Sequence, residues 1–199
     1  MIRALALLAA TTLYAHGQSE WPTFNGDFSG KRFSSLKQVD RSNVASLALA
    51  WAFQTDLNSG IGLKSTPLLI NGTLFFTAPD DVWSVDARTG QQNWHYHYRQ
   101  NEGLHIGQRG LGYHSNKLYF ETPDAHLQCL DAITGKVKWD VVLADVKLGF
   151  WATMAPLVIR DHVLAGISGD FNDLHGFIDS FDPETGKLQW QWNSLPKPG

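Results

Sequence analysis

Hydrophobic and polar positions alternate over short stretches through most of the chain. From Val82 to Ala87 the side chains fall into two alternating sets, with the period of two that is typical of a β-strand. Similar runs recur along the sequence, bounded by Asn, Asp, Ser and Gly, the residues that commonly form turns between strands. The pattern therefore predicts an all-β chain made of many short strands.

Three pairs of these runs are typical of β-hairpins, over residues 66–77, 110–120 and 155–166. The turn of the first pair is Asn-Gly, a dipeptide that favours a type I′ turn between two strands. The three expected turns are Asn71-Gly72, Ser115-Asn116 and Arg160-Asp161-His162.

The motif Asp-x-x-Thr-Gly-x-x-x-Trp follows each hairpin. It ends at Trp94, Trp139 and Trp190, which are 45 and 51 residues apart. Asp and Thr side chains bond to turn backbone and Gly accepts a positive φ, so the motif predicts another turn between two strands. Each unit then holds four antiparallel strands, and a repeat of about 40–50 residues made of strands indicates β-propeller blades.

A four-stranded sheet that is apolar on both faces is unstable alone, so neighbouring blades are expected to cover it. We interpret the recurring Trp residues as contacts between blades and not as catalytic groups. The segment from Leu47 to Gln54 is also strand-like but has no hairpin partner. We expect it to close the ring by joining the last blade.

Composition narrows the class of protein further. The chain has 199 residues, of which 43% are hydrophobic, with 8 Trp and 1 Cys. This apolar content excludes bulk disorder, and a single Cys excludes both a disulfide framework and a Cys-x-x-Cys zinc site. The formal net charge is −3 and there is no basic block. We therefore expect no nucleic-acid partner.

The first 17 residues have the pattern of a signal peptide. A short positive start is followed by the apolar stretch Ala4–Leu13 and by small residues at Ala15 and Gly17. We predict a signal peptide over 1–17, a periplasmic location, and a partial propeller domain over 18–199. A buried N-terminal helix is the alternative interpretation of the same pattern.

The segment Trp21–Thr55 resembles the N-terminal signature of pyrroloquinoline-quinone-dependent alcohol dehydrogenases, the eight-bladed quinoproteins. The three Trp motifs are similar to that family's tryptophan-docking motif, and the segments 105–110, 121–127 and 166–190 also resemble the family. The likeness runs from Trp21 to the C-terminus. It implies a β-propeller of the eight-bladed quinoprotein type, here an open arc of about three four-stranded blades plus an N-terminal ring-closing strand.

The resemblance also implies an activity. Members of this family are exported enzymes that oxidise a small alcohol-type substrate by hydride transfer to pyrroloquinoline quinone. A calcium or lanthanide ion serves as Lewis acid, an Asp as general base and a cytochrome as electron acceptor. The family's catalytic Asp, Asn metal ligand and Trp beside the cofactor would follow Gly199. We therefore expect this chain alone to be inactive without the C-terminal blades of the same propeller.

Two other functions are compatible with such repeats. One is a non-catalytic propeller scaffold of the outer-membrane assembly type, which would have the blades without the residues of the central loops. The other is a sugar dehydrogenase of the same superfamily, which would differ in its substrate pocket.

Four residues match cofactor-binding positions of the family by resemblance. Arg109 occupies the position of an Arg whose guanidinium suits the carboxylates and quinone oxygens of the cofactor. Thr153 matches a Thr whose hydroxyl donates to a carboxylate. Ser168 and Gly169 match a small loop whose backbone N–H groups approach the cofactor.

Two further positions depart from the family pattern. Lys64 stands where many members carry a Glu that faces the cofactor; it either binds the anionic cofactor or is solvated. The family's Glu metal ligand aligns with Phe171, which cannot bind a metal, but a shift of one residue places Asp170 there. Asp170 is then a candidate calcium ligand, with a loop-capping Asp as the alternative.

His95 and His97 lie two residues apart and therefore on one face of a predicted strand. We favour an exposed outer-strand face for them, with a metal site as the alternative.

Overall fold

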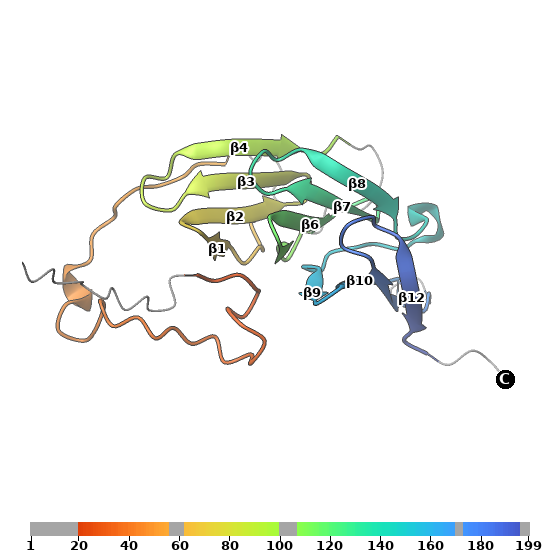
Figure 1. Cartoon of the computed structure of the whole chain (residues 1–199), viewed down its shortest axis with the longest axis horizontal. Coiled ribbons are helices and arrows are strands. Elements are labelled where there is room, and N and C mark those ends of the chain that lie inside the picture. Colours follow the sequence, from red (N-terminus) through yellow and green to blue (C-terminus); the bar gives the residue numbers. More distant parts are fainter. Residues whose placement is uncertain (1–19, 56–61, 100–106, 170–172, 196–199) are drawn as a thin grey trace, which may run out of the picture.

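The computed structural model describes residues 20–55, 62–99, 107–169 and 173–195, and these residues form an all-β structure. Three four-stranded antiparallel sheets follow one another in an open arc (Figure 1). The first contains β1 (Leu68–Ile70), β2 (Thr73–Ala78), β3 (Asp81–Asp86) and β4 (Gln92–His97). The second contains β5 (Gly112–His114), β6 (Lys117–Glu121), β7 (His126–Asp131) and β8 (Val137–Val142). The third contains β9 (Leu157–Ile159), β10 (His162–Ile167), β11 (Phe177–Phe181) and β12 (Leu188–Asn193).

In each sheet the strands pair in sequence order, as expected for a propeller blade. Two short 3-10 helices, η1 (Val44–Ser46) and η2 (Val146–Leu148), lie outside the sheets. Among the described residues, no helix has the length and apolar character needed to cross a membrane. The predicted signal peptide over 1–17 lies outside the described residues.

The predicted hairpins are confirmed, with one adjustment. Asn71 and Gly72 have φ values of +49° and +75°, as a type I′ turn requires, and join β1 to β2. The third turn is shorter than the sequence predicted. His162 belongs to β10 and pairs with Ile159, so Arg160 and Asp161 alone form the turn. The right-handed twist of paired strands favours such two-residue loops.

The Asp-x-x-Thr-Gly turns share one hydrogen-bond arrangement. In the second blade, Asp131 Oδ1 accepts bonds from Ile133 N, Thr134 N and Thr134 Oγ1 at 3.1, 2.9 and 3.0 Å. The bond from the backbone N–H of Thr134 is the main reason why the pKa of Asp131 lies below its ordinary value. Asp86 and Asp182 accept the equivalent bonds in the other two blades.

The hydrophobic core lies between blades. On β6, Leu118 and Phe120 pack in a cluster with residues of the first blade, such as Phe75. The intervening Tyr119 packs in another cluster with residues of the third blade, such as Val163. The alternation of side chains along one strand therefore supplies both interfaces of the middle blade.

Trp side chains cross from one blade to the next. Trp94 Nε1 donates to Ala132 O at 3.1 Å, and Trp139 Nε1 donates to Pro183 O at the same distance. The last repeat Trp, Trp190, has no following blade among the described residues and is 43% exposed.

The expected ring-closing strand over Leu47–Gln54 does not form a strand among the described residues, because no strand pairs with it there. Trp51 of this segment nevertheless contacts the first blade in the same way as Trp94 contacts the second blade and Trp139 the third. Trp51 Nε1 donates to Ala87 O at 3.1 Å. The Trp51 indole therefore occupies the place that the repeat Trp of a preceding blade would occupy.

Candidate functional site

The segments that enter the three inner strands are joined by backbone hydrogen bonds. Thr66 N donates to Arg109 O, and Arg109 N donates to Thr153 O, both at 3.1 Å. Thr66 precedes β1, Arg109 precedes β5 and Thr153 precedes β9. The entries to the three innermost strands therefore lie side by side, and we call residues 64–66, 107–109 and 153–154 the entry cluster.

Arg109 and Thr153, two of the predicted cofactor-binding residues, contact each other within this cluster. Arg109 Nη1 donates to Thr153 O at 3.3 Å and also to the Thr153 hydroxyl. The Arg109 residue is exposed, so a ligand can reach it from solvent. This pairing with Thr153 holds one nitrogen of the guanidinium in place.

Lys64 lies against the same cluster. A Cβ placed on Gly107 would be 2.7 Å from Lys64 Cδ, so the Lys stem crosses the backbone two residues before Arg109. Gly107 has a φ of +109°, a conformation that residues with a side chain rarely adopt. Glycine at 107 therefore allows two cationic side chains to approach the entry to β5.

Ser168 and Thr153 line one groove of about 300 Å³ between the segment that precedes β9, the end of β10, the start of β11 and the end of β12. The Ser168 N–H donates to Trp151 O at 3.0 Å, so it is already used within the protein. Gly169 is buried, and a Cβ there would be 2.8 Å from Leu174 Cβ and 3.0 Å from Phe150 Cδ1. Packing against these side chains is thus one physical reason for glycine at position 169.

Glu121 lies in the segment 121–127 that resembles the family, but the sequence interpretation did not place it in the site. It ends β6, is fully buried, and accepts hydrogen bonds from Met154 N at 2.9 Å and from Gly166 N at 3.3 Å. Burial raises the pKa of Glu121 well above its ordinary value, although both bonds and the charge of Arg109 favour the carboxylate. A Glu that directly follows the apolar run Leu118–Phe120 was the available signal.

Gln108 of the entry cluster has a buried polar atom that bears on whether a polar ligand fits there. Its side chain is buried and donates to Ala152 O at 3.2 Å, but the buried Oε1 has no hydrogen-bond partner among the described residues. A buried polar atom without a partner costs free energy, so a ligand donor or a water would stabilise it. The donors beside it, Arg109 and Lys64, suit the carboxylates of a ligand, whereas Gln108 Oε1 calls for a hydrogen-bond donor from the ligand or from water.

The predicted metal ligand, Asp170, lies outside the described residues. Of the five predicted cofactor residues, Arg109 and Thr153 contact each other, and Lys64 lies beside Gly107. Ser168 shares a groove with Thr153, and Gly169 is the next residue along the chain.

Comparison with known proteins identifies the chain's relatives. Residues 21–199 match the model of the glucose/ethanol/alcohol dehydrogenase β-propeller domain of the PQQ family. The chain belongs to this family. The quinone-dependent alcohol dehydrogenase, dehydrogenase subunit, of Gluconacetobacter polyoxogenes is 36% identical over 194 residues, which cover 89% of this chain and 26% of that protein.

Solved structures of the family have the same fold. The quinohemoprotein alcohol dehydrogenase ADHIIG from Pseudomonas putida aligns with a TM-score of 0.84 at 29% identity, covering 90% of this chain and 27% of the other. A europium-containing methanol dehydrogenase aligns with a TM-score of 0.81 at 31% identity, covering 91% and 33%. The open arc of blades and its family are therefore confirmed.

The chain spans about a quarter of the length of the curated relatives that it matches. The quinoprotein dehydrogenase family is favoured over a scaffold, because these relatives are dehydrogenases that align along nearly all of the chain.

Proposed function

We propose that this chain forms the N-terminal part of a quinoprotein dehydrogenase that oxidises a small alcohol-type substrate with pyrroloquinoline quinone. The observation that carries the proposal is the entry cluster, where Arg109 is bonded to Thr153 and Lys64 crosses the backbone nearby. When bound, the quinone would supply the hydride acceptor for the reaction. The chain's own residues would bind and orient it.

The cofactor is a polycarboxylate, and the cluster offers matching charges. Arg109 would hold a carboxylate or quinone oxygen through its remaining N–H donors, while Thr153 fixes the orientation of the guanidinium. Lys64 would add a second positive charge. A Lys at this position attracts an anionic ligand more strongly than the Glu that many family members carry there. Ser168 would contribute its hydroxyl from the groove that it shares with Thr153.

We further propose that the complete enzyme binds a calcium or lanthanide ion beside the quinone and passes electrons to a cytochrome. One relative is a europium-containing methanol dehydrogenase, and another is a 1-butanol dehydrogenase (cytochrome c) of Thauera butanivorans. Asp170 remains the candidate ligand from this chain. Export to the periplasm remains a proposal that rests on the sequence of residues 1–17.

Titration of the chain with pyrroloquinoline quinone, followed by quenching of Trp fluorescence, tests the binding role. Replacing Arg109 by Gln should weaken binding by about tenfold, the effect of losing one charge-assisted hydrogen bond of about 1.5 kcal/mol. Arg88→Gln is the matched control, because Arg88 is an exposed Arg in the β3–β4 turn. Equal affinities of the two variants would refute a specific role for Arg109.

The isolated chain should not catalyse alcohol oxidation. Dye reduction with pyrroloquinoline quinone, calcium and a small alcohol should equal the rate without protein, because the family's catalytic Asp belongs to later blades. Quinone-dependent dye reduction by the 199-residue chain would contradict this part of the proposal, whatever the binding titration shows.

A further inference from the structure

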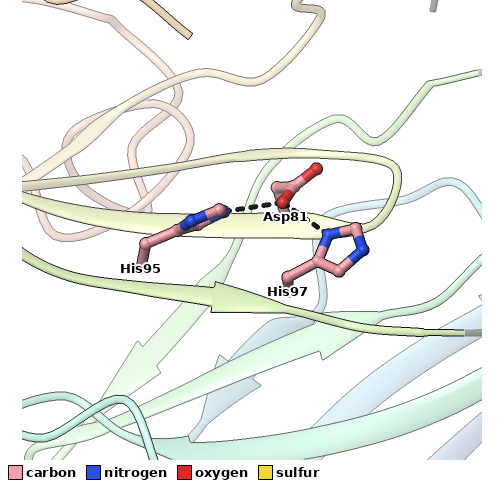
Figure 2. Close-up of side chains that lie close together, drawn as sticks. All are labelled: Asp81, His95 and His97. Atoms are coloured by element: carbon pink, nitrogen blue, oxygen red, sulfur yellow. Dashed lines mark hydrogen bonds and ion pairs between the residues drawn. The ribbon is translucent and has the colours of Figure 1, made fainter. Parts of the chain in front are cut away.

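The outer strands of the first blade bring two imidazoles and one carboxylate together. Asp81 Oδ1 lies 2.6 Å from His95 Nε2 and 2.8 Å from His97 Nδ1. Figure 2 shows both rings turned toward the same carboxylate oxygen, while the second oxygen of Asp81 points away from them. Ligand atoms of the three residues all lie within 4.8 Å of one another.

We propose that Asp81, His95 and His97 form a binding site for a divalent transition-metal ion such as Zn²⁺. The site lies on β3 and β4, apart from the entry cluster, and the proposal does not depend on the bound quinone. Imidazole and carboxylate are ligands that Zn²⁺ and Cu²⁺ accept, whereas Ca²⁺ and Mg²⁺ prefer sets made of oxygen.

Strand register explains why the three groups share a face. Asp81 on β3 is directly opposite His97 on β4, and His95 is two residues away on the same strand. Side chains two residues apart point to the same side of a sheet, so the diagonal His95 also faces the carboxylate. A His-x-His segment opposite an Asp therefore presents three donors without any loop rearrangement.

The distances suit an ion with a small local shift. Zn²⁺ bonds of about 2.0–2.1 Å place tetrahedral ligands about 3.3 Å apart. To bind the metal, each ring nitrogen that faces Asp81 Oδ1 would present its lone pair, and the proton of the neutral imidazole would sit on the other ring nitrogen. The carboxylate oxygen would withdraw from each ring by less than about 1 Å, and rotation of the His side chains would bring the two ring nitrogens, which lie within 4.8 Å of each other, to the spacing that the ion requires.

Packing holds the His95 ring in place, and both imidazoles are accessible to solvent. The His95 ring stacks on the buried Trp83 indole, with centroids 4.9 Å apart and planes within 3°. The side chain of Asp81 is 11% exposed, whereas those of His95 and His97 are 36% and 49% exposed. A metal ion can therefore approach from solvent and keep water as its remaining ligand, as in open three-ligand sites.

The equivalent place in the second blade provides an internal comparison. There His126 Nδ1 lies 2.7 Å from Asp140 Oδ1, and Gln128 bonds to the other oxygen of that carboxylate. This second cluster has one imidazole, and its acid is already paired with an amide. It should bind Zn²⁺ far more weakly, so His126→Gln serves as the matched control.

Calorimetric titration of the tag-free chain with Zn²⁺ tests the site. We expect one ion per chain, and His95→Gln, His97→Gln and Asp81→Asn should each weaken binding by at least about tenfold, since even supporting residues of metal sites cost this much. His126→Gln should bind as the unaltered chain does.

Melting curves separate a lost ligand from a lost fold. Metal-free His97→Gln should melt near the unaltered chain because this side chain is half exposed, and Zn²⁺ should raise the melting temperature only where the site is intact. In the unaltered chain, Zn²⁺ should also shift the imidazole NMR signals of His95 and His97 first. Absence of binding, an equal affinity in His95→Gln/His97→Gln, or loss of binding in His126→Gln would overturn the proposal.

Discussion

The indole of Trp51 lies directly over Gly90, so close that a Cβ on residue 90 would be 2.6 Å from Trp51 Cε3. Gly90 also has a φ of +72° in its turn. The same relationship joins Trp94 to Gly135 and Trp139 to Gly186 in the next two blades. Glycine in the repeated motif therefore satisfies two demands, one from the turn and one from the indole of the preceding element.

Replacing Gly90 by Ala should destabilise the chain by about 1–3 kcal/mol, from backbone strain and from displacement of the indole. Gly72→Ala is the control, because Gly72 has a φ of +75° but no atom within 4 Å of its added Cβ. Denaturant unfolding should show a larger loss for Gly90→Ala. Equal losses would mean that the turn alone requires the glycine.

Trp139 and Trp190 occupy the same place in successive repeats but differ in their surroundings. Trp139→Ala should cost about 3–5 kcal/mol, because it removes a large side chain between blades and the bond to Pro183 O. Trp190→Ala should cost less than about 1 kcal/mol, since this Trp is substantially exposed. Comparable losses in unfolding experiments would contradict a role that depends on the following blade.

Glu121 should make the stability of the chain depend on pH. Burial raises the pKa of Glu121 in the folded state, so its contribution is present below the ordinary carboxyl pKa of about 4.3 and is lost as pH rises through the folded value. The stability of the unaltered chain minus that of Glu121→Gln should therefore fall as pH rises. Unfolding curves at several pH values measure this difference, and a rise with pH would contradict it.

The single thiol should be unreactive in the folded chain. Cys129 lies on β7 and is buried, and this burial raises its pKa to about 12. Ellman's reagent at pH 8 should modify it slowly in native protein and rapidly in guanidinium. Rapid labelling of the native chain would show that the interface between the second and third blades opens readily.

Local chemistry made much of the fold predictable from sequence. Asn71-Gly72 and the Asp-x-x-Thr-Gly turns specify their backbone within a few residues, so strands and blades follow from them. The third turn was predicted one residue too long, because pairing of His162 with Ile159 depends on the sheet and not on the residue type. The segment around Trp51 was predicted as a strand, but strand pairing requires a neighbour that the described residues do not include.

The sequence by itself determined the repeat, the turns, the apolar faces of the blades and the likeness to quinoproteins, because each is carried by residues near one another in the chain. Only the tertiary structure decided that Arg109 is bonded to Thr153, that Glu121 bonds to the backbone of the next blade, and that Asp81 meets both His95 and His97. These contacts depend on the register of strands and the packing of blades. Both arise from many small interactions across the whole core, which no single motif encodes.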